Sequence, residues 1–184
     1  MKKPISDRIF SVEEYIQYEW KAERRHEFMN GLLFEKPEEK DLHNEITMAV
    51  LFELVKQLKE KKYEVYFIDL KVAIPDGKKY YYPDIFVTKE ERSENNRYIK
   101  FHPEIIVEVV SKSTHITDYT DKYIDYTKIP SLKYYIIVEP ETILITVCER
   151  SVINEWITHK YTQLNDVVQL QKMNVSFSLS DVYK

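Results

Sequence analysis

Cysteine and glycine are both scarce in this sequence of 184 residues. The single cysteine, Cys148, excludes an intrachain disulfide, and we therefore expect a reducing, cytoplasmic location. Only two glycines are present, Gly31 and Gly77, which excludes a glycine-rich loop that cradles phosphate groups. Each glycine is instead expected to mark a special turn.

Long apolar runs and an excess of positive charge are also absent. No stretch of roughly 18 apolar residues could cross a membrane, and no apolar segment follows the N-terminal lysines as in a signal peptide. The chain has 27 Lys and Arg against 31 Asp and Glu, unlike a protein that coats nucleic acid. We therefore expect no membrane partner, while an enzyme with carboxylate-held metal ions and local basic patches stays compatible with this charge balance.

The sequence does contain enough apolar material for a folded core. Hydrophobic residues make up 43% of the chain and aromatic residues 14%, which indicates a packed globule rather than a disordered chain. Because 184 residues suit one hydrophobic core, we expect residues 1–184 to form a single domain.

The first third of the chain predicts a helix, a hairpin and a second helix. Ser11 and Glu14 form a capping-box pattern, which predicts a helix from about Ser11 to Arg24. Asn30-Gly31 lies between short apolar segments and predicts a β-hairpin. Apolar residues at helical spacing predict a long helix over about residues 42–61.

The rest of the chain alternates between strands and one helix. Two strands over residues 64–74 and 80–88 are expected to pair antiparallel around an Asp76-Gly77 turn, followed by a surface loop. A third strand at "PEIIVEVVS", a helix over residues 114–129 and a strand at "LKYYIIVEP" predict a parallel crossover. Later strands, including "VVQLQ", are expected to extend this sheet antiparallel. The predicted fold class is α/β (α+β), a mixed sheet flanked by helices.

Glu108 is the unexpected residue of the third strand. Alternation places Ile106, Glu108 and Val110 on one face of this apolar strand, and burial of an unpaired carboxylate is costly. Glu108 therefore either pairs with a cation in a structural ion pair or faces a cleft. Asp84 follows Pro83, which cannot donate to a β-ladder and so marks a strand start, an edge or a bulge.

Convergence of these two carboxylates would favour a cation. If the two strands are neighbours, Asp84 and Glu108 can meet at one end of the sheet, where they repel unless a cation lies between them. Hard oxygen ligands favour Mg²⁺, with Mn²⁺ as an alternative.

Four segments carry a resemblance to a known family. "PDIFV", "PEIIVEVVSKST", "DYTDKYIDYTKI" and "LKYYIIVEP" resemble the Uma2 family of restriction-endonuclease-like proteins, within the PD-(D/E)XK nuclease superfamily. The resemblance runs from about Ser11 to Glu139 and includes "HEFMNGLL". It implies a restriction-endonuclease-like core and a metal-dependent endonuclease that acts on DNA, with a homodimer as the expected assembly.

The resemblance also implies roles for individual residues. Asp84 matches the acid of the "PD" half and Glu108 the acid of the second half, so both are expected to bind the metal, together with the backbone carbonyl of Val109. Val110 stands where the superfamily has lysine, and the family pattern suggests Lys122 as a lysine that has migrated to the next helix. Glu27 is expected to contact the metal through water.

Each of these residues also has a structural interpretation. Lys122 and Asp118 are four residues apart and could form an ordinary helical ion pair, or Asp118 could hold Lys122 in place. Glu27 could be a solvated strand charge. Lys71 is a weaker substitute for the missing lysine, and His43 could approach a phosphate or merely open its helix.

Two other kinds of function remain as alternatives. Ser111, Ser113, His115 and Asp118 are too closely spaced for a Ser-His-Asp triad, and no nucleophile-elbow motif is present. A catalytically inactive module on the same fold, binding nucleic acid or a protein, is compatible with Val110. A structural or dimerisation domain would instead pair Glu108 with an Arg or Lys and leave no vacant metal site. Lysine-rich segments could be solvated faces or could contact phosphates.

Overall fold

The computed structural model describes residues 3–91, 97–110 and 117–183. Its helices are α1 (Val12–Glu19), α2 (Asp41–Leu58) and α4 (Tyr123–Tyr126), the last continuing a π-helical segment, Asp118–Lys122. The strands are β1 (His26–Met29), β2 (Leu32–Glu35), β3 (Glu64–Phe67), β4 (Lys71–Ala73), β5 (Lys79–Tyr81), β6 (Ile85–Thr88), β7 (Ile99–Lys100), β8 (Pro103–Val109), β9 (Tyr134–Glu139), β10 (Leu144–Arg150), β11 (Trp156–Tyr161), β12 (Val167–Leu170) and β13 (Val175–Ser178).

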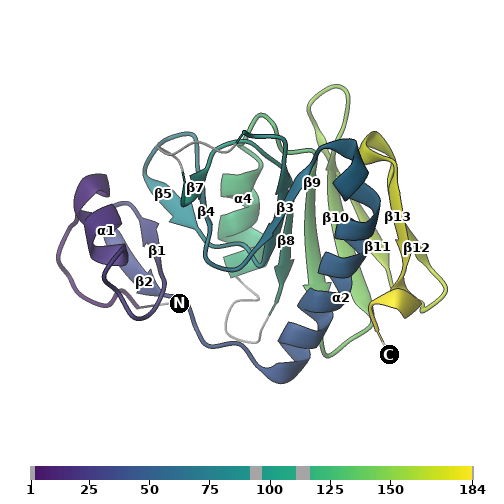
Figure 1. The fold of residues 1–184 in the computed structure, drawn as a ribbon, viewed down its shortest axis with the longest axis horizontal. Helices are drawn as coiled ribbons and strands as arrows, with labels where there is room; N and C mark the ends of the chain where they lie inside the picture. Colours follow the sequence, from purple (N-terminus) through teal and green to yellow (C-terminus); the bar gives the residue numbers. More distant parts are fainter. Residues whose placement is uncertain (1–2, 92–96, 111–116, 184) are drawn as a thin grey trace.

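The strands form two mixed sheets and one separate pair (Figure 1). A five-stranded sheet has the order β2-β1-β5-β4-β7, with β4 and β7 parallel. A six-stranded sheet has the order β11-β10-β9-β8-β6-β3, in which β8 and β9 are parallel as predicted. β10 and β11 extend it antiparallel, also as predicted, but β12 pairs with β13 instead, so its predicted place in this sheet is wrong.

The N-terminal elements follow the predicted capping and turn signals. The Ser11 hydroxyl accepts from the Glu14 amide at 3.1 Å, and the Glu14 carboxylate accepts from the Ser11 amide at 2.8 Å. α1 ends at Glu19 rather than Arg24, because the chain reverses and the buried Glu19 carboxylate accepts from the His26 amide at 2.8 Å. The Asn30-Gly31 turn joins β1 and β2 as predicted, with φ of 51° and 89°.

Two predicted strands are each divided between the two sheets. Residues 64–74 form β3 in the larger sheet and β4 in the smaller one, because Ile68 and Asp69 adopt positive φ of 54° and 64° and break the ladder. Residues 79–88 form β5 and β6, which are separated at Pro83. The Asp76-Gly77 turn therefore joins β4 to β5, as an antiparallel pair within the smaller sheet.

The six-stranded sheet is covered on both faces, and β8 lies inside it between β6 and β9. One core cluster packs β8 residues Ile105, Val107 and Val109 against α2 and the β12–β13 pair. The other packs Ile106 and Val110 against β4, β5 and α4. The predicted alternation along β8 is confirmed, and Glu108 lies on the second face.

The smaller sheet carries α1 on a third cluster around Tyr15, Phe28 and Tyr80. The whole is a mixed α+β fold of sheets flanked by few helices, as predicted. The expected loop after β6 contains the short strand β7, and residues 92–96 and 111–116, which include Ser111, Ser113 and His115, lie outside the described residues. Nowhere in the described part of the chain is a helix long and apolar enough to cross a membrane.

Candidate active site

Asp84 lies between β5 and β6, directly after Pro83, where the chain leaves one sheet and enters the other. Its carboxylate accepts from the Lys36 ammonium at 3.0 Å and from the Val109 backbone amide at 2.8 Å. The His43 ring nitrogen Nε2 lies 3.2 Å from Asp84 Oδ2, the same oxygen that accepts from Val109. Asp84 is therefore held by three separate segments of the chain.

Burial and charge oppose each other at Asp84. Burial raises the pKa of Asp84, but the Lys36 ammonium and His43 lower it by more, so its pKa lies well below the ordinary value. Burial lowers the pKa of His43, whereas Asp84 and the nearby Glu39 raise it above the ordinary value. Asp84 is thus a charged carboxylate in a buried, positively charged setting.

Lys122 is the centre of a second group of charges. Its ammonium lies 2.9 Å from Glu108, 3.0 Å from Asp118 and 3.3 Å from Glu27. All four side chains are at most 4% exposed. The Tyr126 hydroxyl also donates to Glu108 at 2.9 Å. Three carboxylates from β1, β8 and the π-helical segment therefore share one buried ammonium.

The shortage of positive charge affects the protonation of Glu108. Burial raises the pKa of Glu108 to about 8, although the Lys122 ammonium lowers it. Burial lowers the pKa of Lys122, but Asp118, Glu108 and Glu27 raise it well above the ordinary value. Lys122 therefore stays charged, while the raised pKa of Glu108 favours its protonated form near pH 7, and a bound cation would displace that proton.

The two groups of charges meet through the pairing of β6 with β8. These strands are antiparallel with Ile85 opposite Val107, so continuing this register by one residue brings Asp84 opposite Glu108. Residues opposite each other in such a pair place their side chains on the same face. Asp84 and Glu108 therefore face the same side of the sheet at the end of β6.

A cleft of about 170 Å³ opens beside Asp84. Three of its lining residues, Arg25, Lys36 and His43, carry basic side chains, and Glu39, Asn44, Thr47, Ile68, Asp69 and Tyr82 complete its wall together with Asp84. These basic groups lie beside three carboxylates, of which Asp69 accepts from Arg25 and Asp84 accepts from Lys36.

The side chains present fit a hydrated divalent cation held by few protein ligands. No group of three His, Cys, Asp or Glu side chains in the described part of the chain is arranged to enclose a metal ion. Mg²⁺ is commonly held by only one or two carboxylates and keeps several waters. Asp84, directly before β6, and Glu108, in the neighbouring strand β8, supply that number of hard oxygen ligands.

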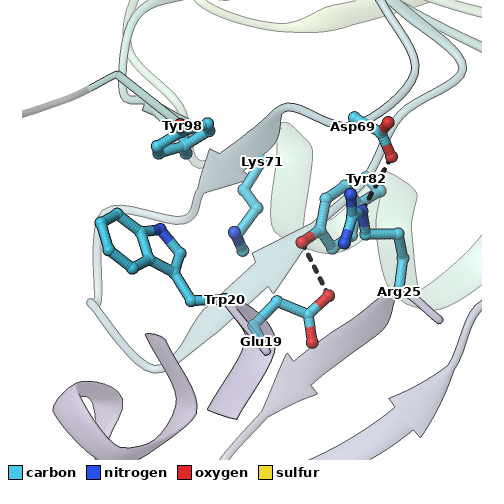
Figure 2. A pocket seen from close by; sticks show the side chains of 7 residues that line it. All are labelled: Glu19, Trp20, Arg25, Asp69, Lys71, Tyr82 and Tyr98. Carbon is cyan, nitrogen blue, oxygen red and sulfur yellow. Dashed lines mark hydrogen bonds and ion pairs between the residues drawn. The ribbon is translucent and has the colours of Figure 1, made fainter. Parts of the chain in front are cut away.

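The residues singled out in the sequence fall into two neighbouring groups, one of Glu27, Glu108, Asp118 and Lys122 and one of Asp84 and His43. Lys71 is not among them, because it points into a different pocket of the smaller sheet (Figure 2). Val110 is 2% exposed and packs in the core, so the position of the usual superfamily lysine is apolar here. The sequence reasoning missed Lys36, since a lysine beside Pro37 after a hairpin carries no recognisable pattern.

The chain matches several known sequences and structures. The sequence model of the Uma2 family, described as "Putative restriction endonuclease", matches residues 12–180. Two proteins of Synechocystis sp. (strain ATCC 27184 / PCC 6803 / Kazusa) are similar. "Uncharacterized protein slr1290" is 26% identical over 95% of this chain and 91% of its own length. "Uncharacterized protein sll1609" is 28% identical over 72% of this chain and 76% of its own length.

A solved structure shares the fold. It is a crystal structure of "a putative nuclease belonging to DUF820" from Anabaena variabilis ATCC 29413, with a TM-score of 0.79 and 16% identity. The match covers 95% of this chain and 97% of the other. At this identity the likeness concerns the arrangement of helices and strands.

Proposed function

This chain belongs to the Uma2 family, and we propose that it is a divalent-metal-dependent endonuclease that hydrolyses phosphodiester bonds of DNA. One observation carries the proposal. Asp84 directly precedes β6, Glu108 lies in the neighbouring strand β8, both are buried, and the Lys122 ammonium lies 2.9 Å from Glu108. A carboxylate pair with a buried lysine, beside a cleft lined by basic groups, suits phosphoryl transfer.

Three groups of this chain would hold the cation, namely the carboxylates of Asp84 and Glu108 and the carbonyl of Val109. The Val109 amide already donates to Asp84. Because the N–H and C=O of a strand residue point to the same neighbour, the Val109 carbonyl faces the same edge. Mg²⁺ or Mn²⁺ bound there would polarise the phosphoryl group and lower the pKa of a bound water.

The basic residues would act on charge that develops during the reaction. Lys122 would hold Glu108 in position and offset negative charge in the transition state. Lys36 and His43 face the cleft beside Asp84, where they would contact the phosphate. Glu27 contacts Lys122 at 3.3 Å and would act by positioning that ammonium.

The proposed substrate and assembly can be stated in physical terms. A chain with a net charge of −4 repels DNA on average, so binding would depend on local groups such as Arg25, Lys36 and His43. One site cuts one strand, and we therefore propose that two copies act together as a homodimer when both strands are cut.

The experiment compares wild type with Asp84→Asn, Glu108→Gln and the exposed control Lys160→Met on supercoiled and single-stranded DNA. We expect cleavage by wild type and Lys160→Met only with Mg²⁺ or Mn²⁺, and a loss of at least about 100-fold in both site variants. Mn²⁺ should also raise the melting temperature of wild type but not of the site variants. Equal cleavage by wild type and Asp84→Asn would refute this site.

A second function is favoured by one observation. Val110 is buried in the core at the position where the superfamily has lysine. An inactive nuclease-fold module would bind nucleic acid or a protein partner without cutting. The same experiment distinguishes the two, because such a module would show neither cleavage nor metal-dependent stabilisation while still binding DNA in a mobility-shift assay.

A further inference from the structure

A second pocket of about 320 Å³ lies where α1 meets the smaller sheet (Figure 2). It is lined by Glu19, Trp20, Arg25, Asp69, Lys71, Tyr82 and Tyr98. Its volume is in the range of pockets that hold small organic ligands. None of the residues proposed for metal binding lines this pocket.

Lys71 is the most unusual residue of this pocket. Its side chain comes from β4, is 5% exposed and points into the pocket (Figure 2). Within the described residues its ammonium forms no ion pair or hydrogen bond, although it lies 5.2 Å from the Tyr82 ring centre. Burial lowers the pKa of Lys71, and the Glu19 charge offsets this only in part. A buried donor of this kind is available for an acceptor on a ligand.

The other charges of the pocket are already paired. Arg25 donates to Asp69 at 2.8 Å, and Glu19 accepts from the Tyr82 hydroxyl and the His26 amide, each at 2.8 Å. Two cations and two carboxylates therefore balance. A phosphate group in this pocket would be repelled by both carboxylates. The pocket therefore suits a neutral group with a hydrogen-bond acceptor.

The opposite wall is aromatic. Trp20 is 74% exposed and meets Tyr98 edge to face, with ring centres 6.0 Å apart. Figure 2 shows both rings on one side of Lys71, with the Arg25–Asp69 pair on the other. An exposed indole beside a second ring offers a surface on which a planar ligand can stack.

This pocket adjoins the candidate active site. Arg25, Asp69 and Tyr82 line both the pocket and the cleft that contains Asp84. A group that enters the pocket would therefore be connected to a phosphate in the cleft by a short link.

We propose that the pocket receives an unpaired nucleobase of the substrate strand, next to the phosphate that is cut. The base stacks on Trp20 beside Tyr98, and Lys71 donates to an acceptor on its edge, as lysine does to guanine. The proposal rests on the proposed nuclease function. It makes single-stranded or locally unpaired DNA the preferred substrate, because a base in a regular duplex must first leave the stack.

Tryptophan fluorescence tests this pocket without cleavage. The chain has two tryptophans, so Trp156→Phe leaves Trp20 as the only indole. In EDTA, this protein is titrated with guanosine monophosphate, ribose 5-phosphate, a single-stranded oligonucleotide and the same strand with abasic sites. We expect guanosine monophosphate and the intact strand to quench Trp20, and ribose 5-phosphate and the abasic strand to do so at least about tenfold more weakly.

Variants then test the two contacts. Lys71→Met should weaken binding of the intact strand about tenfold relative to Lys21→Met, which removes a charge from an exposed neighbour of Trp20. Trp20→Ala, at an exposed position, should weaken binding by roughly 5- to 150-fold in fluorescence anisotropy with a labelled strand.

Several results would overturn the proposal. Equal quenching by base-free probes, or unchanged binding in both Lys71→Met and Trp20→Ala, would show that no base enters. Quenching by guanosine monophosphate but not by the intact strand would make the pocket a free-nucleotide site. Base-dependent binding without cleavage would instead contradict the nuclease function alone, whereas cleavage without base-dependent binding would contradict the pocket alone.

Discussion

Replacement of Lys122 by methionine removes an ammonium that lies within 3.3 Å of Glu27, Glu108 and Asp118. Methionine keeps the length and the apolar stem of lysine. The change therefore leaves the packing in place and takes away one buried positive charge.

The cost follows from burial. Removing one partner of a buried ion pair typically destabilises a protein by about 3–5 kcal/mol, because the remaining charge cannot reach water. Protonation of Glu108 keeps the cost within this range at pH 7, since burial raises the pKa of Glu108 to about 8. For a chain of this size, a loss of about 3–5 kcal/mol lowers the melting temperature by roughly 6–20 °C.

Thermal melting in EDTA at pH 7 measures this effect, with Lys160→Met as the exposed control. A second variant makes the test sharper. Glu27→Gln alone should destabilise the protein, but in the Lys122→Met background it should stabilise it, because it neutralises a buried carboxylate whose contact with the Lys122 ammonium has been removed. A melting temperature of Lys122→Met within 2 °C of wild type, or additive effects of the two changes, would refute the reasoning.

Two further predictions concern the proton on Glu108 and the turn at Gly31. Below pH 8, a divalent cation must displace the proton of Glu108. Calorimetry in buffers of different ionisation enthalpy should therefore show the release of about one proton at pH 7. The affinity for the cation should rise with pH up to about pH 8 and then stay constant. The release should vanish in Glu108→Gln. Gly31→Ala should destabilise the protein by more than about 1 kcal/mol in urea unfolding, since φ is +89° and a Cβ would lie 2.7 Å from Ile9. Gly77→Ala shares the positive φ but meets nothing within 4 Å, so an equal loss in both would contradict the steric argument.

The pKa shifts of Glu108 and Asp84 set the direction in which the stability of the protein changes with pH. A carboxyl group whose pKa is raised in the folded state binds more protons when the chain is folded. The contribution of Glu108 to the free energy of unfolding therefore falls as the pH rises from the pKa of Glu108 in the unfolded chain to its pKa of about 8 in the folded chain. Asp84 has a lowered pKa, and its contribution is lost only under acid conditions.

Local signals in the sequence predicted much of the fold. The capping box at Ser11, the Asn30-Gly31 turn and the alternation around Glu108 each depend on residues close together in the chain, and each is present in the structure. The breaks at Ile68 and Pro83 were not foreseen as changes of sheet. Ile68 at positive φ opposes its local preference, so only the packing of the whole chain can impose it.

The sequence predicted only some of the charged contacts in the candidate site. Asp84 and Glu108 stand out because each carboxylate interrupts an apolar strand pattern. Lys36 and the shared contacts of Lys122 depend on how the smaller sheet lies against the larger one, for which no spacing rule exists. The catalytic and metal-binding roles of these residues stay predictions until cleavage is measured.

The passage of the chain from one sheet to the other bears on the order of folding. Glu27 belongs to the five-stranded sheet, and Glu108 belongs to the six-stranded sheet. Their shared contact, Lys122, lies 95 residues after Glu27, so the charge cluster forms only through long-range closure. When the β1–β2 hairpin has folded on the ribosome but β8 and Lys122 have not yet been synthesised, the site is not assembled. We therefore expect the proposed activity only in a chain whose two sheets have already joined.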